Sequence, residues 1–138
     1  MILGIGSDLV DIRRIQASLD RFGDRFAARI FTAGERARAD AAGRGPVRAA
    51  LYAKRFAAKE AATKALGTGY ADGVHFKDIE VVSDGKGRPA LLLSGGARDR
   101  LSALVPAGMD ARIDLSMTDE PPYAQAFVVI SAIAQPPA

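Results

Sequence analysis

The sequence predicts an α+β fold built as a single small domain, and three observations carry that prediction. A chain of 138 residues that is 49% hydrophobic is long enough for one buried core. Segments with alternating apolar residues stand near both ends, whereas segments with three- and four-residue apolar spacing fill much of the interior. Strands and helices do not alternate regularly, so we expect a small antiparallel sheet packed against a long helix.

The first strand is predicted over residues 2–5, which are β-prone. Gly4 and Gly6 interleave with its apolar residues, so we expect another segment to approach its backbone closely. Asp8 is expected just past the end of this strand. An acid in that position is by itself usually a turn former or a helix cap.

Two helical regions are predicted next. Apolar residues recur every three or four positions over residues 12–30, which indicates one long or two successive amphipathic helices with a break at Gly23. Residues 33–45 are rich in Ala, Gly, Arg and Asp, and we expect a loop there with no more than a helical turn. The longest predicted helix spans residues 46–66, from a proline that suits a first turn to the stop at Gly67.

The next segment predicts a hairpin followed by a helix. Residues 74–83 are β-branched and alternating, residues 84–87 have the turn sequence Asp-Gly-Lys-Gly, and residues 90–93 are a return strand. Ser94 is the expected cap of a helix whose apolar positions continue to Val105.

Two more strands are expected to complete the sheet. Residues 111–118 alternate between apolar and polar side chains, and residues 123–133 form a last strand that pairs with them. The sequence Glu-Pro-Pro at residues 120–122 forces the connection. We expect a domain over residues 1–134 and a disordered proline-rich tail over residues 135–138.

The composition excludes several kinds of site. The chain has no cysteine, so it offers no disulfide, thiolate zinc site or cysteine nucleophile. Its net charge of +3 favours an anionic partner, but it lacks the aromatic and basic interleaving that stacks nucleic-acid bases. It has no apolar run of about 20 residues and no basic signal-peptide start. We therefore expect a cytoplasmic protein with no membrane insertion and no nucleic-acid partner.

One constellation of charged residues admits two interpretations. Helical spacing of about 100° per residue places Glu60 and Lys64 one turn apart at an alanine-lined edge of the predicted long helix. The ordinary interpretation is a surface pair worth about 0.3–0.5 kcal/mol. The alternative adds Asp8: two carboxylates, water and a phosphate can hold Mg²⁺, with a lysine nearby to balance the phosphate charge. These residues alone leave both interpretations open.

Two longer motifs resemble the signatures of a known family. Residues 4–12 are Gly-Ile-Gly-Ser-Asp-Leu-Val-Asp-Ile, and residues 55–69 are Arg-Phe-Ala-Ala-Lys-Glu-Ala-Ala-Thr-Lys-Ala-Leu-Gly-Thr-Gly. They resemble the first and second signatures of the holo-acyl-carrier-protein synthases, and the second is long and highly specific. The likeness covers nearly the whole chain in order, through Phe31-Thr32, Glu35, Ile79-Glu80-Val81, Gly87-Arg88-Pro89, Tyr123-Ala124 and Ala126.

The resemblance implies a 4′-phosphopantetheinyl transferase-like fold and a magnesium-dependent reaction. In that reaction 4′-phosphopantetheine moves from coenzyme A to a serine of an apo acyl carrier protein, and 3′,5′-ADP is released, in support of fatty-acid biosynthesis. Asp8 and Glu60 are implied to be catalytic residues that ligate Mg²⁺, and Lys64 a catalytic residue that contacts the coenzyme phosphates. The resemblance also implies a homotrimer with sites between neighbouring subunits.

Five further residues have an implied contact and a simpler interpretation. Gly67 and Gly69 are predicted to bring backbone N–H groups to the coenzyme, although such a pair is more often a helix C-cap. Arg14, Arg21 and Arg25 share a face if one helix runs through them, and their usual meaning is a solvated surface. The family presents arginines from this region to the acidic recognition helix of the carrier protein, so we predict docking there.

One segment departs from the family pattern. Relatives often have His-Val-Ser-x-Thr-His where this chain has Asp114, Ser116, Thr118 and Asp119 at the corresponding positions. Ser116 matches and is predicted to bind the coenzyme, but both histidines are replaced. The one histidine, His75, lies in a predicted strand, where a structural role is the more common one. Asp114, a metal-binding carboxylate or a metal-polarised water must then accept the serine proton.

A second function is compatible with the charge distribution. A non-enzymatic basic module could bind an acidic protein or nucleic acid through the arginine-rich first helix. Binding of that kind would survive chelation of metal ions and the loss of Asp8. The transferase requires both, so chelation separates the two hypotheses.

Overall fold

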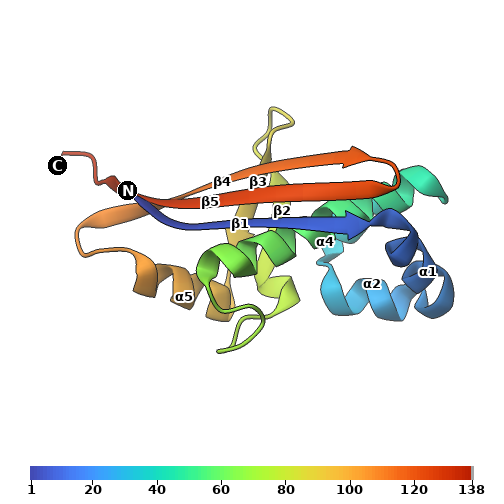
Figure 1. Cartoon of the computed structure of the whole chain (residues 1–138), viewed down its shortest axis with the longest axis horizontal. Coiled ribbons are helices and arrows are strands. Elements are labelled where there is room, and N and C mark those ends of the chain that lie inside the picture. Colours follow the sequence, from blue (N-terminus) through green and yellow to red (C-terminus); the bar gives the residue numbers. More distant parts are fainter. Residues whose placement is uncertain (138) are drawn as a thin grey trace.

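Three long strands form one antiparallel sheet in the order β1–β5–β4, in a computed structural model that describes residues 1–137. The strands are β1 (Ile2–Asp11), β4 (Met109–Glu120) and β5 (Tyr123–Ala134). Helices cover one face of this sheet, and the start of β1 and the end of β5 lie at the same end of it (Figure 1). The predicted α+β class with a small antiparallel sheet is confirmed.

Helix α4 (Pro46–Leu66) packs along the sheet and has the bounds that the sequence predicts. Pro46 occupies the first turn, where a missing N–H costs nothing. Gly67 ends the helix in the left-handed conformation, with φ at 80°. Within the described residues, neither α4 nor another helix is long and apolar enough to cross a membrane.

The glycines of β1 allow the strand to touch the backbone of α4. A Cβ atom added at Gly6 would lie 1.9 Å from the carbonyl oxygen of Ala61, and one added at Gly4 would lie 1.9 Å from that of Ala65. No real side chain fits at such a distance, so only glycine permits this packing. The predicted close approach is confirmed, and its partner is the helix that carries the second signature.

Strand β1 is longer than predicted, and Asp8 lies inside it rather than past its end. The prediction was wrong because Gly, Ser and Asp have low strand propensity, whereas pairing with β5 holds the strand as far as Asp11, opposite Tyr123. Neighbouring residues in a strand point to opposite faces. Asp8 therefore shares the α4 side of the sheet with Gly6 and Val10, both of which are buried.

The other face of the sheet is open and largely apolar. The side chains of Ile5 and Leu9 on β1 are 69% and 60% exposed, and Phe127 on β5 is 46% exposed. Ser116 on β4 lies opposite Phe127 in the register and so shares this face. An exposed apolar patch of this kind usually marks an interaction surface.

Three short helices connect β1 to α4. Helices α1 (Ile12–Phe22) and α2 (Asp24–Ile30) are separated at Gly23, as predicted. Helix α3 (Ala33–Asp40) occupies most of a segment that was predicted to be a loop. That prediction was wrong because Thr32 and Glu35 form a capping box that starts a helix in an alanine-rich segment with little apolar periodicity.

The β2–β3 hairpin forms a separate two-stranded sheet that runs across the direction of the long strands (Figure 1). Strand β2 (Ile79–Ser83) pairs with β3 (Pro89–Leu93), and α5 (Gly95–Leu104) follows with Ser94 at its N-cap. Strand β2 begins five residues later than predicted, because a turn at Val74 and the short 3₁₀ helix η1 (Phe76–Asp78) occupy the first half of the predicted strand.

Strands β4 and β5 pair along their whole length and are longer than predicted. The pairing reaches Glu120 opposite Tyr123, so the two intervening prolines make a tight connection. Residues 135–137 contain no helix or strand, and residue 138 lies outside the described residues. The domain limit at residue 134 and the disorder of residues 135–138 remain predictions.

Candidate active site

Asp8 on β1 and Lys64 on α4 meet where the strand touches the helix. The Lys64 Nζ atom lies 3.2 Å from Asp8 Oδ1 and donates to the Ser7 carbonyl oxygen at 2.9 Å. The Lys64 side chain is 54% exposed and the Asp8 side chain 17%. This ion pair is therefore open to solvent on one side, where a ligand can reach it.

Glu60 lies one turn before Lys64 and lines the same cleft as Asp8. Burial raises the pKa of the Glu60 carboxyl, and the negative charge of Asp8 raises it further, while Tyr70 and Lys64 act in the opposite direction. The Tyr70 hydroxyl is buried and has no hydrogen-bond partner among the described residues. Its effect on Glu60 therefore comes from proximity and not from a hydrogen bond of ordinary geometry.

The two carboxylates fit the donor set of a magnesium site. Carboxylate oxygens are hard ligands of the kind that Mg²⁺ prefers, and a divalent cation would relieve the repulsion between Asp8 and Glu60. Residues 1–137 contain no group of three or more His, Cys, Asp or Glu side chains that could hold a metal. Two carboxylates suffice for Mg²⁺, because this ion usually retains water and binds substrate phosphates.

The cleft beside these carboxylates has a volume of about 310 Å³ and a mixed lining. Asp8, Glu60 and Arg14 are among its charged residues, and the side chains of Ile15, Phe26 and Phe56 provide apolar surface. It lies between β1, the first two helices and α4. Charged residues next to apolar ones suit a ligand or protein segment that is itself partly charged and partly apolar.

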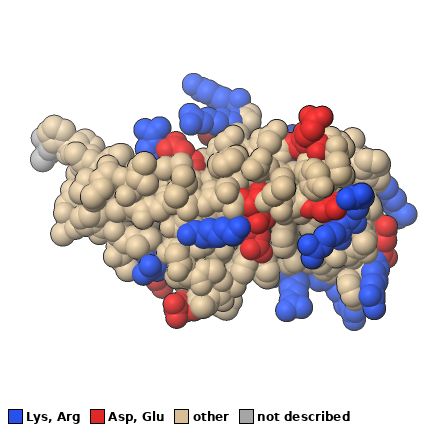
Figure 2. Space-filling view, in the orientation of Figure 1, with Lys and Arg blue, Asp and Glu red and all other residues tan. Residues whose placement is uncertain are grey.

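The three predicted docking arginines lie on two helices, all of them exposed. Arg14 lines the cleft with Asp8 and Glu60, whereas Arg21 stacks on the Phe22 ring at 5.0 Å. Arg25 follows the break at Gly23, so the continuous helix required for a single face is not present. Basic side chains nevertheless gather at the end of the molecule that carries α1 and α2 (Figure 2).

The amides of Gly67 and Gly69 cap helix α4. The Gly67 N–H donates to the carbonyl oxygen of Thr63 at 3.0 Å and to that of Lys64 at 3.1 Å, and the Gly69 N–H donates to Thr63 at 3.4 Å. These N–H groups are therefore engaged in the described structure. A contact between these two glycines and a phosphate remains a prediction.

Ser116 does not share the Asp8 cleft within one chain. It lies on the opposite edge strand, β4, and on the open face of the sheet, whereas Asp8 faces α4. Asp114 is on the same open face and is held by Arg112 at 3.0 Å and Arg88 at 3.7 Å. Coenzyme contact by Ser116 and proton transfer by Asp114 would therefore require a second copy of the chain.

Asp119, which replaces a family histidine, and His75, the one histidine of the chain, do not line the cleft of Asp8 and Glu60. Asp119 pairs with Lys54 at 3.0 Å. His75 is exposed and precedes η1, so its predicted place in a strand was wrong. Its backbone N–H donates to the Asp78 carboxylate at 3.2 Å, which gives it a local structural role.

A second cleft, which the sequence analysis missed, lies between α4 and the β2–β3 hairpin. It has a volume of about 660 Å³, and we call it the cationic cleft because Arg38, Lys54 and Arg55 line it together with Glu80. Arg55 is only 8% exposed, and its Nε atom has no hydrogen-bond partner within residues 1–137. The sequence feature that could have pointed to this cleft is Arg55, the first residue of the second signature.

Comparisons with known proteins show the family to which the chain belongs. The sequence profile of the 4′-phosphopantetheinyl transferase superfamily matches residues 4–116. A protein named holo-[acyl-carrier-protein] synthase from Rhodopseudomonas palustris (strain HaA2) is 63% identical over 134 residues, which cover 96% of this chain and 95% of that protein. One of the same name from Methylobacterium sp. (strain 4-46) is 62% identical over 133 residues, with 96% of each chain covered.

Solved structures extend the likeness to the fold. The holo-[acyl-carrier-protein] synthase of Neisseria meningitidis superposes with a TM-score of 0.80 at 39% identity, covering 95% of this chain and 99% of that one. The Bacillus anthracis enzyme gives a TM-score of 0.74 at 37% identity, covering 94% and 96%. Profile, relatives and fold agree, and the chain belongs to the 4′-phosphopantetheinyl transferase superfamily.

Proposed function

We propose that this chain is a holo-[acyl-carrier-protein] synthase that transfers 4′-phosphopantetheine from coenzyme A to a serine of an apo acyl carrier protein and releases 3′,5′-ADP. The observation that carries the proposal is that Asp8 and Glu60 line one open cleft and that Lys64 forms an ion pair with Asp8. Two relatives support the choice of substrate. The B. anthracis structure is a complex with CoA (3′,5′-ADP), and the Helicobacter pylori structure is a complex with coenzyme A.

Asp8 and Glu60 would hold Mg²⁺ from the protein side of the cleft. The bound ion would offset charge on the transferring phosphoryl group and on the leaving phosphate. Lys64 now donates to Asp8 and to a backbone carbonyl, and its exposed stem leaves it free to turn to the coenzyme phosphates. Binding then holds the carrier serine in line with the phosphorus atom.

A carboxylate of the metal site, Asp8 or Glu60, or a metal-polarised water would accept the serine proton. Without a metal ion, burial and the charge of Asp8 raise the pKa of Glu60, and a bound cation would act against that rise. Asp114 is held by two arginines on the other face of the sheet. The proposal therefore gives Asp114 a part in contacts between copies and not in proton transfer within one chain.

The complete site would form between copies of the chain, in a homotrimer. Asp8 is on one edge strand of the sheet, and Ser116 and the cationic cleft adjoin the opposite edge strand. The open apolar face supplies a surface for association. The nucleotide phosphates would then bind Arg55 and the other basic residues of the cationic cleft in one copy, while the pyrophosphate meets Lys64 of its neighbour.

Mixing two inactive variants tests this shared site. Asp8→Asn lacks a metal ligand, and Arg55→Gln lacks the arginine of the cationic cleft. After the subunits are mixed and allowed to exchange, some sites combine an intact Asp8 with an intact Arg55, so transfer activity is expected to return. Light scattering should give three times the mass of the chain. Failure to complement in a trimer that exchanges subunits would contradict a site divided in this way.

The acyl carrier protein would dock on the basic end of the molecule. Arg14 lines the Asp8 cleft, and Arg21 and Arg25 lie exposed on α1 and α2. Basic side chains gather at this end of the molecule (Figure 2). Opposite charge speeds encounter and fixes the register of two proteins. The proposed setting is fatty-acid biosynthesis in the cytoplasm.

The decisive experiment is a transfer assay read by mass spectrometry. The protein is incubated with coenzyme A, MgCl₂ and an apo acyl carrier protein, and the carrier is weighed. A gain of one phosphopantetheine group that EDTA abolishes and excess Mg²⁺ restores is the expected result. Asp8→Asn and Glu60→Gln should each lower the rate by about 100-fold or more, the order seen when a charge-stabilising group is removed.

An exposed acid that does not line the cleft, Glu120, provides the matched control. Glu120→Gln also removes one carboxylate, and transfer should continue at the wild-type rate. If the carrier gains no mass with any of several apo carriers, the transferase proposal is wrong. The non-enzymatic binding module is then favoured if the carrier still binds in EDTA.

A further inference from the structure

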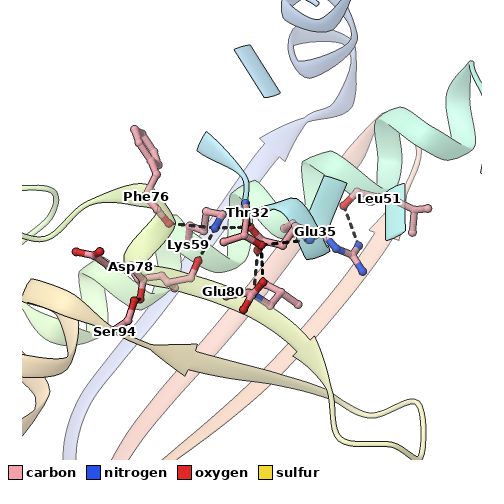
Figure 3. Close-up of polar contacts among 11 residues, drawn as sticks. Thr32, Glu35, Leu51, Lys59, Phe76, Asp78, Glu80 and Ser94 are labelled. Atoms are coloured by element: carbon pink, nitrogen blue, oxygen red, sulfur yellow. Dashed lines mark hydrogen bonds and ion pairs between the residues drawn. The ribbon is translucent and has the colours of Figure 1, made fainter. Parts of the chain in front are cut away.

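A buried ion pair joins α3 to α4, and the proposed reaction assigns no role to either of its residues. Lys59 Nζ is 2.7 Å from Glu35 Oε1, and both side chains are 0% exposed. Lys59 also donates to the carbonyl oxygens of Phe76, at 3.0 Å, and Ile79. All three of its N–H groups are thus engaged. Figure 3 shows these groups converging between α4 and the start of β2.

Glu35 uses both of its carboxylate oxygens. Oε1 accepts from the Thr32 amide at 2.9 Å, and Oε2 accepts from the Val81 amide at 2.9 Å. The ion pair therefore holds β2 on both sides of Glu80, through Ile79 and through Val81. Glu80 is tied to the same cluster, because its carboxylate accepts a hydrogen bond from the Thr32 hydroxyl (Figure 3).

The strand held in this way is one wall of the cationic cleft. Glu80 and Val81 line the cleft from β2, and Lys54 and Arg55 line it from α4. The ion pair links these walls, because Lys59 belongs to α4 and its acceptors include the first residue of β2. Lys59 also directly precedes Glu60, so the same anchor adjoins a residue that lines the Asp8 cleft.

We propose that the Lys59–Glu35 pair is a positioning device that fixes the β2–β3 hairpin against α4 and so sets the shape of the cationic cleft. The inference rests on the proposed function, in which this cleft takes the nucleotide part of coenzyme A. A buried ion pair gives little net stability over apolar residues of equal volume. An ammonium group, however, can hold two carbonyls and a carboxylate at once, which no apolar side chain does.

A neutral version of the pair tests the inference. The Lys59→Met/Glu35→Gln variant leaves no charge at the pair and keeps an oxygen acceptor for one of the Thr32 and Val81 amides, but it releases the other amide and the carbonyl groups of Phe76 and Ile79. We expect the dissociation constant for 3′,5′-ADP, measured by calorimetry, and the KM for coenzyme A to rise about tenfold. The kcat at saturating coenzyme A should stay within about threefold, and amide exchange over residues 79–83 should accelerate.

The matched control removes another ion pair between the same two helices. Arg48 Nε and Asp40 Oδ1 are 2.9 Å apart, and these two residues line another cleft and not the cationic cleft. The Arg48→Met/Asp40→Asn variant should bind 3′,5′-ADP as tightly as the wild type. A folded neutral-pair variant that also binds like the wild type would overturn the inference and leave the pair a purely structural feature.

A milder comparison decides the matter if the neutral-pair variant does not fold. Thr32→Val removes the hydroxyl that ties Glu80 to the cluster, whereas Thr32→Ser retains a hydroxyl. We expect about threefold weaker binding of 3′,5′-ADP for the valine variant than for the serine variant, and equal binding would overturn the inference. Failure of the wild type itself to bind 3′,5′-ADP and to transfer would identify the proposed function as the error.

Discussion

Helix α4 carries two lysine–carboxylate pairs with opposite character. Lys59 and Glu35 are fully buried, and every N–H of the lysine has a partner. Lys64 and Asp8 are 54% and 17% exposed, and the lysine donates to two acceptors, which leaves one N–H free for solvent or a ligand. The residue types are the same, so burial and partner saturation distinguish the pair that holds the fold from the pair that can receive a substrate.

The largest expected effect is on stability at the buried pair. Lys59→Met leaves Glu35 charged and without its counter-ion inside the protein, so the free energy of unfolding should fall by about 3–5 kcal/mol. Urea titration followed by circular dichroism measures this loss. Lys64→Met, at the open pair, should change the free energy of unfolding by less than about 1 kcal/mol. Equal losses in the two variants would break the comparison.

The second effect is on activity at the open pair. Lys64→Met removes the cation nearest to Asp8, so kcat/KM for coenzyme A should fall about 100-fold while the protein remains folded. Steady-state transfer assays with the mass-spectrometric readout measure it. Lys77→Met removes an exposed lysine on η1 and is the control, with unchanged activity. Full activity in Lys64→Met would show that the open pair is only a surface contact.

The third effect is a pH dependence carried by Glu60. Because its pKa is raised in the folded state, Glu60 contributes stability that is complete below the unfolded pKa of about 4.3 and is lost as the pH rises through the folded value. In EDTA, the wild type and Glu60→Gln should have similar Tm values at pH 4. At pH 7 the Tm of the glutamine variant should be raised relative to that of the wild type. Calorimetry across this range measures it.

Magnesium should reverse the order of the two Tm values at pH 7, so that the wild type becomes more stable than Glu60→Gln. At pH 7, adding MgCl₂ is expected to raise the Tm of the wild type by binding only the folded state, with a much smaller effect on Glu60→Gln. Glu120→Gln, an exposed acid, is expected to follow the wild type in both conditions. A Tm difference between wild type and Glu60→Gln that is independent of pH would contradict the raised pKa.

The smallest expected effect is on carrier docking at the basic end. Replacing Arg14, Arg21 or Arg25 by glutamine should slow association with the carrier a few-fold at low salt, and the difference should shrink at high salt. Stopped-flow binding at two ionic strengths measures it. Arg98→Gln, an exposed arginine on α5, should leave the association rate unchanged. Loss of kcat without loss of association would assign these arginines to the reaction instead.

Local patterns predicted much of the fold. The bounds of α4 follow from Pro46, Gly67 and the helix formers between them, and the close approach of β1 follows from Gly4 and Gly6. Helix α3 was missed because its start depends on a capping box more than on apolar periodicity. Strand β2 was likewise predicted to start too early from a local pattern, since a β-branched segment can also form turns.

The candidate site was predictable only where its residues lie in the two signatures. The resemblance pointed to Asp8, Glu60 and Lys64, and the structure brings them together across the contact of β1 with α4. The Lys59–Glu35 pair and the cationic cleft were not foreseen. Helical periodicity assigns charged residues to the surface, whereas the burial of Lys59 depends on acceptors from three other segments of the chain.

The glycine contact between β1 and α4 has a consequence for protein engineering. The spacing of the two elements is set by main-chain atoms, because Gly4 and Gly6 rest on carbonyl oxygens of the helix. Redesign of side chains elsewhere in the interior should therefore leave the distance between the two carboxylate-bearing elements unchanged. A designer who transfers this strand and helix to another scaffold would need to keep both glycines to retain that distance.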